Sequence, residues 1–460
     1  MGGAVAADRI NGVGTRITIH ALTRFYRLFA VDGPWHRLLS NSGWLLFDQF
    51  LRVAAGALLS LWIARHYGPT QLGAFNYAMA IVALWTPIAS GSLDVLVIRD
   101  LVKDAAAARV ILASAHVLRL LAALVSIGGA LAMAAIAARP EDQSLVVLVL
   151  LAALSTLFQS AFVVDSWYQS QGQTRVGAMV RSLAFMVGAS LRIAAVMADA
   201  DVALLAIAVA VEALVAGLLF HGFYRKKEGL LLDLRAADWR RVRAYLAEGK
   251  NIILTGVLIG IYMRVDRVMI GSLLDNRAVG IYSVAVQLCE LFYLLPNAVL
   301  LSIYPTLVSL HAANEERYRQ RLLQAMAAFF YGSLAIALAF SFAAPWLIGI
   351  LLGPSYTESA TIARIYIFLL PLISMSVIFS HWYVLYGKTA ISMYGTVIGG
   401  ASALLLNYLL IQRFGLPGAL YAALISMLMP TVIVSLLFDR RVGSAFLDAI
   451  TFRFKLRNAV

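Results

Sequence analysis

The sequence predicts an all-α integral membrane protein with about twelve transmembrane helices in two six-helix lobes around a central cavity. Hydrophobic residues make up 62% of the 460 positions and charged residues only 13%, with a mean hydropathy of +0.83. A soluble domain is about half apolar and about a quarter charged. The apolar residues also gather into runs that match the roughly 20 residues of a membrane-spanning helix. These observations exclude an ordinary soluble enzyme.

Twelve apolar runs can be drawn along the chain, and each is too long for a strand. They cover residues 43–64, 73–98, 111–138, 144–166, 177–198, 202–222, 251–273, 279–304, 323–344, 361–385, 391–411 and 418–438. The connections between them are short, so no soluble catalytic domain fits into the remainder of the chain.

The distribution of basic residues predicts the orientation in the membrane. The net charge is +13, and with the N-terminus inside, 26 of the 37 Lys and Arg lie in inner segments. The outer loops hold only Arg65, Arg139, Arg277 and Arg413. Cytoplasmic loops carry an excess of Lys and Arg. Both termini are therefore predicted to be cytoplasmic, and the positive charge is attributed to topology and not to a nucleic-acid partner.

A long polar interruption with two basic runs divides the chain into nearly equal halves. A weak internal similarity supports the division, because Gly73-Ala-Phe-Asn-Tyr77 opens the second span and Gly280-Ile-Tyr-Ser-Val284 opens the eighth. Two similar helical halves are typical of alternating-access transporters. The predicted parts are a basic cytoplasmic tail at 1–42, an N-terminal lobe at 43–222, a basic cytoplasmic linker at 223–250, a C-terminal lobe at 251–438 and a cytoplasmic tail at 439–460.

Motifs for metal, cofactor or catalytic chemistry are not found. The single cysteine, Cys289, excludes an intrachain disulfide, and no two of the seven histidines are closer than 16 positions. Gly387-Lys388-Thr389 lacks the earlier glycine of a phosphate-binding loop. We therefore expect no catalytic residue, no metal site and no cofactor.

Ionisable residues inside the spans are the informative ones, because a charge at the bilayer centre is costly unless it faces water or a partner. Asp48 and Arg52 in the first span share a helix face at i, i+4. Two interpretations stay open: the two charges neutralise each other, or Arg52 lines a cavity and Asp48 holds it in place.

The seventh span carries Arg264, Asp266 and Arg267 within four positions. Arg264 and Arg267 lie on one face, and one acid cannot neutralise both. In the fifth span, Arg192 lies deeper than Arg181, which is near the inner surface.

Glu212 and Glu290 are the deep acids of the sixth and eighth spans. Each is either a partner for the arginines or a proton or sodium site, and pairing is the favoured interpretation. Aromatic residues near the same levels either stack on sugars or fill space; these are Trp85, Tyr262, Phe292 and Tyr293.

A cavity with surplus arginine calls for an anionic ligand, and the planar guanidinium fork fits phosphate oxygens. The candidates for binding a diphosphate are Arg52, Arg192, Arg264 and Arg267. The candidates for a supporting or ion-coupling role are Asp48, Glu212, Asp266 and Glu290. A proton or sodium gradient is the candidate driving force.

Several stretches resemble a known family. In the first half they are 44–52 (WLLFDQFLR), 63–78 (IARHYGPTQLGAFNYA) and 93–101 (LDVLVIRDL), and in the second half 264–271 (RVDRVMIG), 279–286 (VGIYSVAV) and 352–356 (LGPSY). They resemble the polysaccharide and O-antigen flippases (Wzx-type) of the multidrug, oligosaccharidyl-lipid and polysaccharide exporter superfamily, and the resemblance covers about residues 43 to 438.

The resemblance implies a multi-pass carrier in the bacterial inner membrane that moves an undecaprenyl-diphosphate-linked oligosaccharide to the outer leaflet without ATP. Its expected partners are that lipid-linked oligosaccharide, membrane lipids and the polysaccharide polymerase machinery. The alternatives are a multidrug exporter of the same superfamily, for which one expects an acid-rich cavity, and a membrane polysaccharide polymerase or ligase, for which one expects a larger outer loop.

Overall fold

The computed structural model shows an all-helical chain. It describes residues 34–90, 93–138, 144–228, 234–438 and 440–451, with side chains described except at 34–51, 227–228, 440–441 and 450. These residues form helices, and the part of the chain so described contains no strand. The all-α prediction is confirmed.

The chain divides into two compact units, and the first, Met1–Val53, is described only from residue 34. Its described residues form the beginning of helix α2 (Pro34–Ser90). Proline at the first position of a helix is favourable because the N–H that it lacks has no partner there. The tail before residue 34 and the side chain of Asp48 lie outside the described residues.

The second unit, Ala54–Val460, contains the rest of α2, which is two helices merged across a kink. At the kink Gly68 has φ 72° and ψ 174°, and Pro69 follows. A positive φ suits glycine, and proline restarts a helix readily. The break therefore separates the first two predicted spans.

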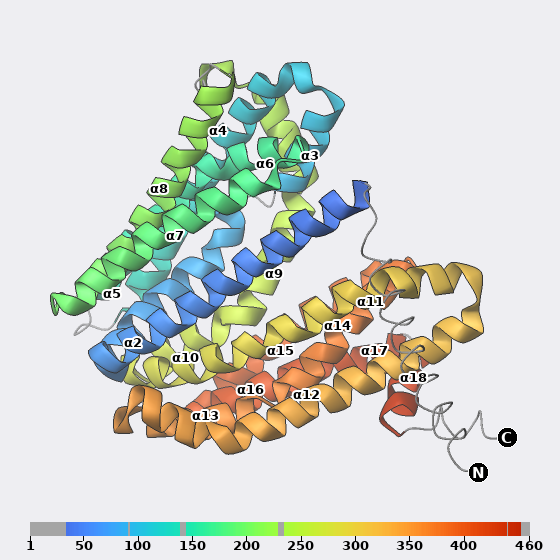
Figure 1. The fold of residues 1–460 in the computed structure, drawn as a ribbon. Helices are drawn as coiled ribbons and strands as arrows, with labels where there is room; N and C mark the ends of the chain where they lie inside the picture. The colour runs from blue at the N-terminus through green and yellow to red at the C-terminus, as the bar shows by residue number, and fades with distance from the viewer. Residues whose placement is uncertain (1–33, 91–92, 139–143, 229–233, 439, 452–460) are drawn as a thin grey trace, which may run out of the picture. The chain divides into compact units, whose positions relative to one another are not determined.

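The helices between the kink and the linker pack on one another, and we call them the N-terminal lobe. They are α3 (Asp94–Lys103), α4 (Ala108–Ala137), α5 (Ser144–Gln159), α6 (Val163–Ser170), α7 (Thr174–Met197) and α8 (Ala203–Glu228). Helix α8 packs on both α5 and α7, α4 on α5, and α3 on α6 (Figure 1).

Helix α9 (Trp239–Leu273) connects this lobe to the next, because it packs on α4 and also on α10 and α15. The helices of the C-terminal lobe are α10 (Asn276–Glu290), α11 (Leu294–Ala313), α12 (Glu315–Leu352), α13 (Thr357–Tyr366), α14 (Leu369–Leu385), α15 (Thr389–Phe414), α16 (Leu416–Leu428), the π-helix η6 (Met429–Val434), α17 (Ser435–Phe438) and α18 (Arg440–Ile450). Helices α15 and α16 lie side by side (Figure 1).

Nine described helices are long and apolar enough to cross a membrane, or ten when the bent pair Pro354–Tyr366 and Leu369–Leu385 is one span. The sequence predicted about twelve. The first candidate, Arg52–Lys103, contains the second predicted span and residues 52–64 of the first, and α9 is not a candidate although it contains the seventh. The charges of Arg264, Asp266 and Arg267 lie in this predicted span and lower its hydropathy.

The last part of the predicted linker is helical, because α9 begins at Trp239. Asp238 caps the helix by accepting from the N–H of Arg240. Tyr245 donates to Asp100 Oδ2 on α3 (3.0 Å), and Arg99 pairs with Glu248 (2.9 Å). Burial raises the pKa of Tyr245 to about 12, so its hydroxyl stays protonated at neutral pH. The start of α9 is thus held on the N-terminal lobe.

The two lobes also meet where α2 crosses α10. A Cβ on Gly73 would lie 1.6 Å from the carbonyl oxygen of Asn276, and one on Gly280 would lie 1.9 Å from that of Pro69. Only glycine permits so close an approach of two backbones. Gly73 and Gly280 head the two similar stretches of the sequence, so the repeated motif is the contact between the lobes.

Candidate functional site

Arg264 and Arg267, near the C-terminal end of α9, lie beside Glu290, the last residue of α10. Arg267 Nη2 lies 3.0 Å from Glu290 Oε1, and Arg264 Nη1 lies 3.8 Å from the same oxygen. Tyr282 donates to Asp266 Oδ2 (2.8 Å). We call these five residues the α9 cluster. Glu290 contacts both arginine side chains, and with Asp266 the cluster holds two acids and two arginines, so the surplus of positive charge that the seventh span suggests by itself is cancelled.

The two arginines of the α9 cluster differ in accessibility. The side chain of Arg267 is 9% exposed and donates to Glu290, whereas that of Arg264 is 37% exposed. A separation of 3.8 Å exceeds hydrogen-bond distance. Arg267 therefore neutralises Glu290, and Arg264 is the arginine of the cluster that a ligand can reach.

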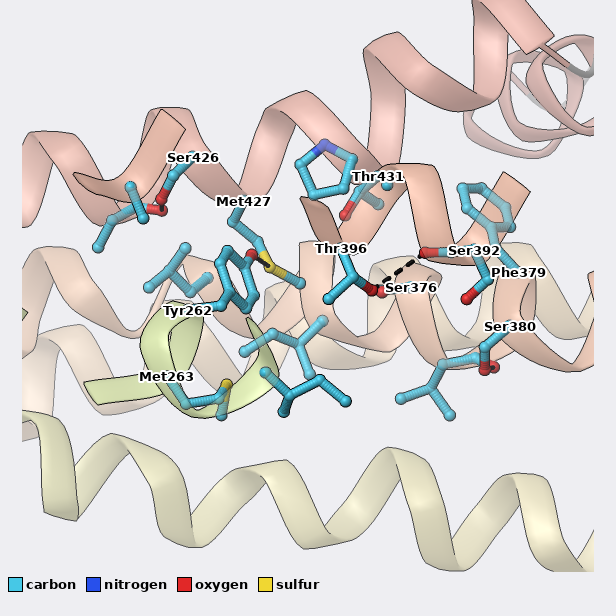
Figure 2. Close-up of a pocket in the computed structure, with 18 of the residues that line it drawn as sticks. Tyr262, Met263, Ser376, Phe379, Ser380, Ser392, Thr396, Ser426, Met427 and Thr431 are labelled. Atoms are coloured by element: carbon cyan, nitrogen blue, oxygen red, sulfur yellow. Dashed lines mark hydrogen bonds between the residues drawn. The ribbon is translucent and has the colours of Figure 1, made fainter. Parts of the chain in front are cut away.

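A cavity of about 400 Å³ lies in the C-terminal lobe, and Asp266 and Glu290 form part of its wall. We call it the C-lobe cavity. Residues of α9, α14, α15, α16 and η6 line most of it (Figure 2). Its wall carries many hydroxyl groups, from Ser376, Ser380, Ser392, Thr396, Ser426, Thr431 and Ser435 and from Tyr262, Tyr293, Tyr366 and Tyr383. Among its described lining residues none is Lys, Arg or His.

The deep arginine of the fifth span has an acidic partner. Arg192 Nη2 lies 2.6 Å from Glu212 Oε2, and Gly188 on α7 leaves the space that the glutamate occupies. Arg181, nearer the inner surface, pairs with Asp165 at 2.7 Å. The predicted pairing of Glu212 and Glu290 with arginines is thus confirmed in both lobes. The roles of these residues toward a substrate or a coupling ion stay predictions.

One ion pair was not foreseen from the sequence. Arg119 on α4 is 3% exposed and lies 2.5 Å from Asp94 of α3, which also accepts from Ser166. The pair holds α3, α4 and α6 together. Both charges were visible in the sequence, but only their depth and partners identify a structural role.

The first predicted pair can be placed only in part. Arg52 lies on α2 in the first unit, and the side chain of its predicted partner Asp48 is outside the described residues. The structure thus brings together Arg264, Asp266, Arg267 and Glu290, places Arg192 with Glu212 in the other lobe, and leaves the Asp48 and Arg52 pair a prediction.

The four aromatic candidates have separated roles. Tyr262 and Tyr293 line the C-lobe cavity. Phe292 packs on Phe340 with ring centroids 5.0 Å apart, and the ring of Trp85 occupies the space beside Gly129. The first two remain candidates for contact with a ligand, and the last two fill space.

The hydroxyl groups of the C-lobe cavity could not be recognised as a site from charge, because serine and threonine are uncharged. The signal that was available is their spacing on spans ten to twelve, for example Ser376 and Ser380, or Ser392 and Thr396. In the described residues no group of three or more His, Cys, Asp or Glu could hold a metal ion.

Comparison with known proteins identifies the family. A family model described as polysaccharide biosynthesis protein matches residues 38–311, which is more than half of the chain. The chain belongs to this family. A second model, described as MatE, matches residues 252–409. No curated protein sequence matches the chain.

Solved structures of transporters share the fold. The lipid II flippase MurJ in an inward closed conformation aligns with a TM-score of 0.69 at 14% identity, covering 90% of this chain and 92% of that one. An inward-facing multidrug resistance MATE family transporter of the MOP superfamily aligns with a TM-score of 0.65 at 15% identity, covering 86% of this chain and 95% of that one. A MOP superfamily transporter from Pyrococcus furiosus, described as having a binding pocket of reverse polarity, aligns with a TM-score of 0.54 at 16% identity. The alignment covers 87% of this chain and 93% of that one.

The first family model establishes the family, and the solved structures, at 14 to 16% identity, establish a shared fold. The structural neighbours are a lipid II flippase and a multidrug resistance transporter, and nine or ten of the described helices of this chain are candidate membrane spans. The resemblance stated from the sequence motifs is confirmed at the level of family and fold.

Proposed function

We propose that the protein is a flippase that moves an undecaprenyl-diphosphate-linked oligosaccharide across the bacterial inner membrane by alternating access, for the synthesis of a surface polysaccharide or O-antigen. The observation that carries the proposal is that the side chain of Arg264 is 37% exposed and lies beside Glu290, whose charge is compensated by Arg267. The match to the polysaccharide biosynthesis family supports it. Membrane lipids and the polymerase machinery are its proposed neighbours, and no nucleic acid is involved.

The α9 cluster is suited to binding a diphosphate. Arg264 offers a planar set of donors that match phosphate oxygens. Glu290 would repel an anion if it were unpaired, but Arg267 holds it at 3.0 Å and compensates its charge. An incoming diphosphate would therefore replace the loose 3.8 Å contact between Arg264 and Glu290 without leaving a buried carboxylate unpaired. Arg192 and Arg52 are the further candidates.

Alternating access requires that the lobes separate at one end while they meet at the other. The α2 and α10 crossing at Gly73 and Gly280 is such a meeting point, and Tyr356 adds to it by donating to the carbonyl of Ala64 (2.8 Å). In the proposed topology this end faces outward, so the described state is closed to the outside. A proton or sodium gradient is the proposed driving force, with the acids of the two lobes as candidate coupling groups.

A multidrug exporter is the second candidate, and two observations favour it. The MatE model matches residues 252–409, and the C-lobe cavity has two carboxylates and no base among its described lining residues. Such a wall would suit an organic cation. The wider match to the polysaccharide biosynthesis model makes the flippase the preferred function.

The test is complementation of a strain that lacks its own exporter, with surface polysaccharide as the readout. Arg264→Lys should lower export partially and Arg264→Ala severely, at unchanged protein abundance, because lysine supplies charge but not two parallel donors. Loss of one charged hydrogen bond costs about 1.5 to 3 kcal/mol, or roughly tenfold to hundredfold in affinity.

Arg277→Ala is the matched control, because Arg277 is an exposed arginine whose acidic partner Glu358 lies 3.4 Å away. It should leave export unchanged. Wild-type polysaccharide levels in the Arg264→Ala, Arg267→Ala double variant would remove the α9 cluster from the transport mechanism.

A further inference from the structure

The C-lobe cavity has a polarity that does not suit the phosphate part of a lipid-linked substrate. Its two charged wall residues are carboxylates, and the described lining contains no base. Both carboxylates already have partners: Asp266 accepts from the Tyr282 hydroxyl and from the backbone N–H of Arg267, and Glu290 accepts from the Arg267 side chain. What remains for a ligand is a largely apolar wall that also carries hydroxyl and amide groups.

Among these groups, Asn407 and Thr431 each bury a polar atom that has no hydrogen-bond partner among the described residues. Asn407 and Thr431 are each 2% exposed, and both line the cavity. The Asn407 amide nitrogen donates to the carbonyl of Ala403 (2.8 Å), but in the described part of the chain its oxygen Oδ1 and the Thr431 Oγ1 have no partner. Figure 2 shows the Thr431 hydroxyl directed into the cavity. A buried polar group without a partner is costly, so the two atoms point to a hydrogen-bonding ligand.

The wall that carries Thr431 has an unusual backbone. Residues Met429–Val434 form a π-helix, a widened turn that is often found at functional sites. Pro430 in this turn packs against α15, where a Cβ on Gly395 or Gly399 would lie 3.4 or 3.2 Å from the proline ring. Tyr262 lies against Gly399 from the other side and makes a contact with Met427. The π-helix thus has firm support and holds Thr431 at the cavity.

We propose that the C-lobe cavity binds the uncharged sugar that is attached to the diphosphate of the transported lipid. This proposal rests on the proposed function and adds a second subsite to it. A volume of about 400 Å³ falls within the range of small-molecule pockets. Glu290 belongs both to the cavity wall and to the α9 cluster, so a diphosphate at Arg264 and a sugar in the cavity would be neighbours.

The sugar hydroxyls would donate to Asn407 Oδ1 and exchange hydrogen bonds with Thr431 Oγ1. Tyrosine rings such as that of Tyr262 offer an apolar face against which a sugar ring can pack. An uncharged ligand also leaves the hydrogen bonds of Asp266 and the ion pair of Glu290 undisturbed, whereas a cation would compete with Arg267 for the carboxylate of Glu290.

The test measures binding to the purified full-length protein in lipid nanodiscs. The probes are undecaprenyl diphosphate and the same lipid carrying a single uncharged hexose or N-acetylhexosamine. The wild-type protein should bind at least one of the sugar-bearing lipids more tightly than the sugar-free lipid. Thr431→Val and Asn407→Leu should each weaken sugar-lipid binding about threefold to tenfold and leave binding of undecaprenyl diphosphate unchanged.

Thr156→Val is the matched control. Thr156 in the N-terminal lobe is also 2% exposed, but its hydroxyl donates to the carbonyl of Ala153 (2.7 Å) and it lies outside the cavity. This change should leave the preference for sugar intact. Arg264→Ala should weaken the binding of both lipids, which separates the diphosphate subsite from the sugar subsite.

A preference for sugar that survives in the Thr431→Val, Asn407→Leu double variant would overturn the proposal while leaving the flippase function standing. A second result would also overturn the proposal and leave the flippase function standing. In it, sodium ions alone raise the melting temperature of the wild-type protein, both variants abolish this effect, and the wild-type protein shows no preference for the sugar-bearing lipid. The cavity would then be a cation site. If neither lipid binds the wild-type protein, the proposed function itself fails.

Discussion

Replacement of Gly280 by alanine should open the contact between the lobes. The new Cβ would lie 1.9 Å from the carbonyl oxygen of Pro69, about 1 Å inside the 3.0 Å that real Cβ contacts respect. Both partners are backbone, so neither can turn away as a flexible side chain would. Insertion of a methyl group into a tight contact costs about 1 to 3 kcal/mol. At 1.4 kcal/mol per tenfold, this shifts the balance from the closed toward the open outer end about 5- to 150-fold.

The shift can be measured as a distance distribution between two spin labels. Asp201→Cys and Thr357→Cys, in a Cys289→Ser background, are exposed positions on the two lobes near the contact. Gly280→Ala should enlarge the fraction of long distances. Gly349→Ala is the matched control, because no atom lies within 4 Å of its Cβ. A Gly280→Ala distribution equal to that of the parent protein would refute the idea that this crossing holds the outer end closed.

Two further predictions concern topology and the first span. Cysteines at Lys227 and Thr357 in the Cys289→Ser background should be labelled by an impermeant reagent in intact cells only at Thr357, and labelling at Lys227 would contradict the proposed topology with both ends inside. The double swap Asp48→Arg, Arg52→Asp should stay inactive in polysaccharide export if Arg52 meets the diphosphate, because an acid would then face an anion, whereas restored export would mean that the pair only neutralises itself.

Much of the fold could be predicted from the sequence because membrane spans depend on length and hydropathy, which are local properties. Each predicted span overlaps one or more described helices, and Gly68-Pro69 marks the break between the first two. The number of candidate spans is lower than twelve for two reasons. Helix α2 continues through the break between the first two predicted spans, and charged residues interrupt the apolar run of α9.

The candidate site could be predicted only in part, because pairing depends on how each helix is rotated about its axis. The acids Glu212 and Glu290 were recognisable as partners from their depth, but the sequence could not decide whether Arg264 or Arg267 would hold Glu290. In the structure the choice falls on Arg267, and this leaves Arg264 accessible.

The hydroxyl groups were harder to interpret for a related reason. A threonine in a membrane helix commonly donates to its own backbone, as Thr396 does to the carbonyl of Ser392 (3.0 Å). Thr431 has the same chemistry but no such partner. Only the three-dimensional structure distinguishes the two, because the π-helix changes the position of Thr431 relative to the preceding turn.

The most direct test of the proposed function is the rate of transport in proteoliposomes that contain the purified protein and a fluorescent undecaprenyl-diphosphate-linked oligosaccharide. Accessibility of the sugar to a quencher or a glycosidase outside the vesicle would follow its movement between leaflets. We expect rapid movement with the wild-type protein, a rate at least tenfold lower with Arg264→Ala, and an unchanged rate with Arg277→Ala. Equal rates for the wild-type protein, Arg264→Ala and protein-free liposomes would contradict the central claim that this protein flips a lipid-linked oligosaccharide through a site that includes Arg264.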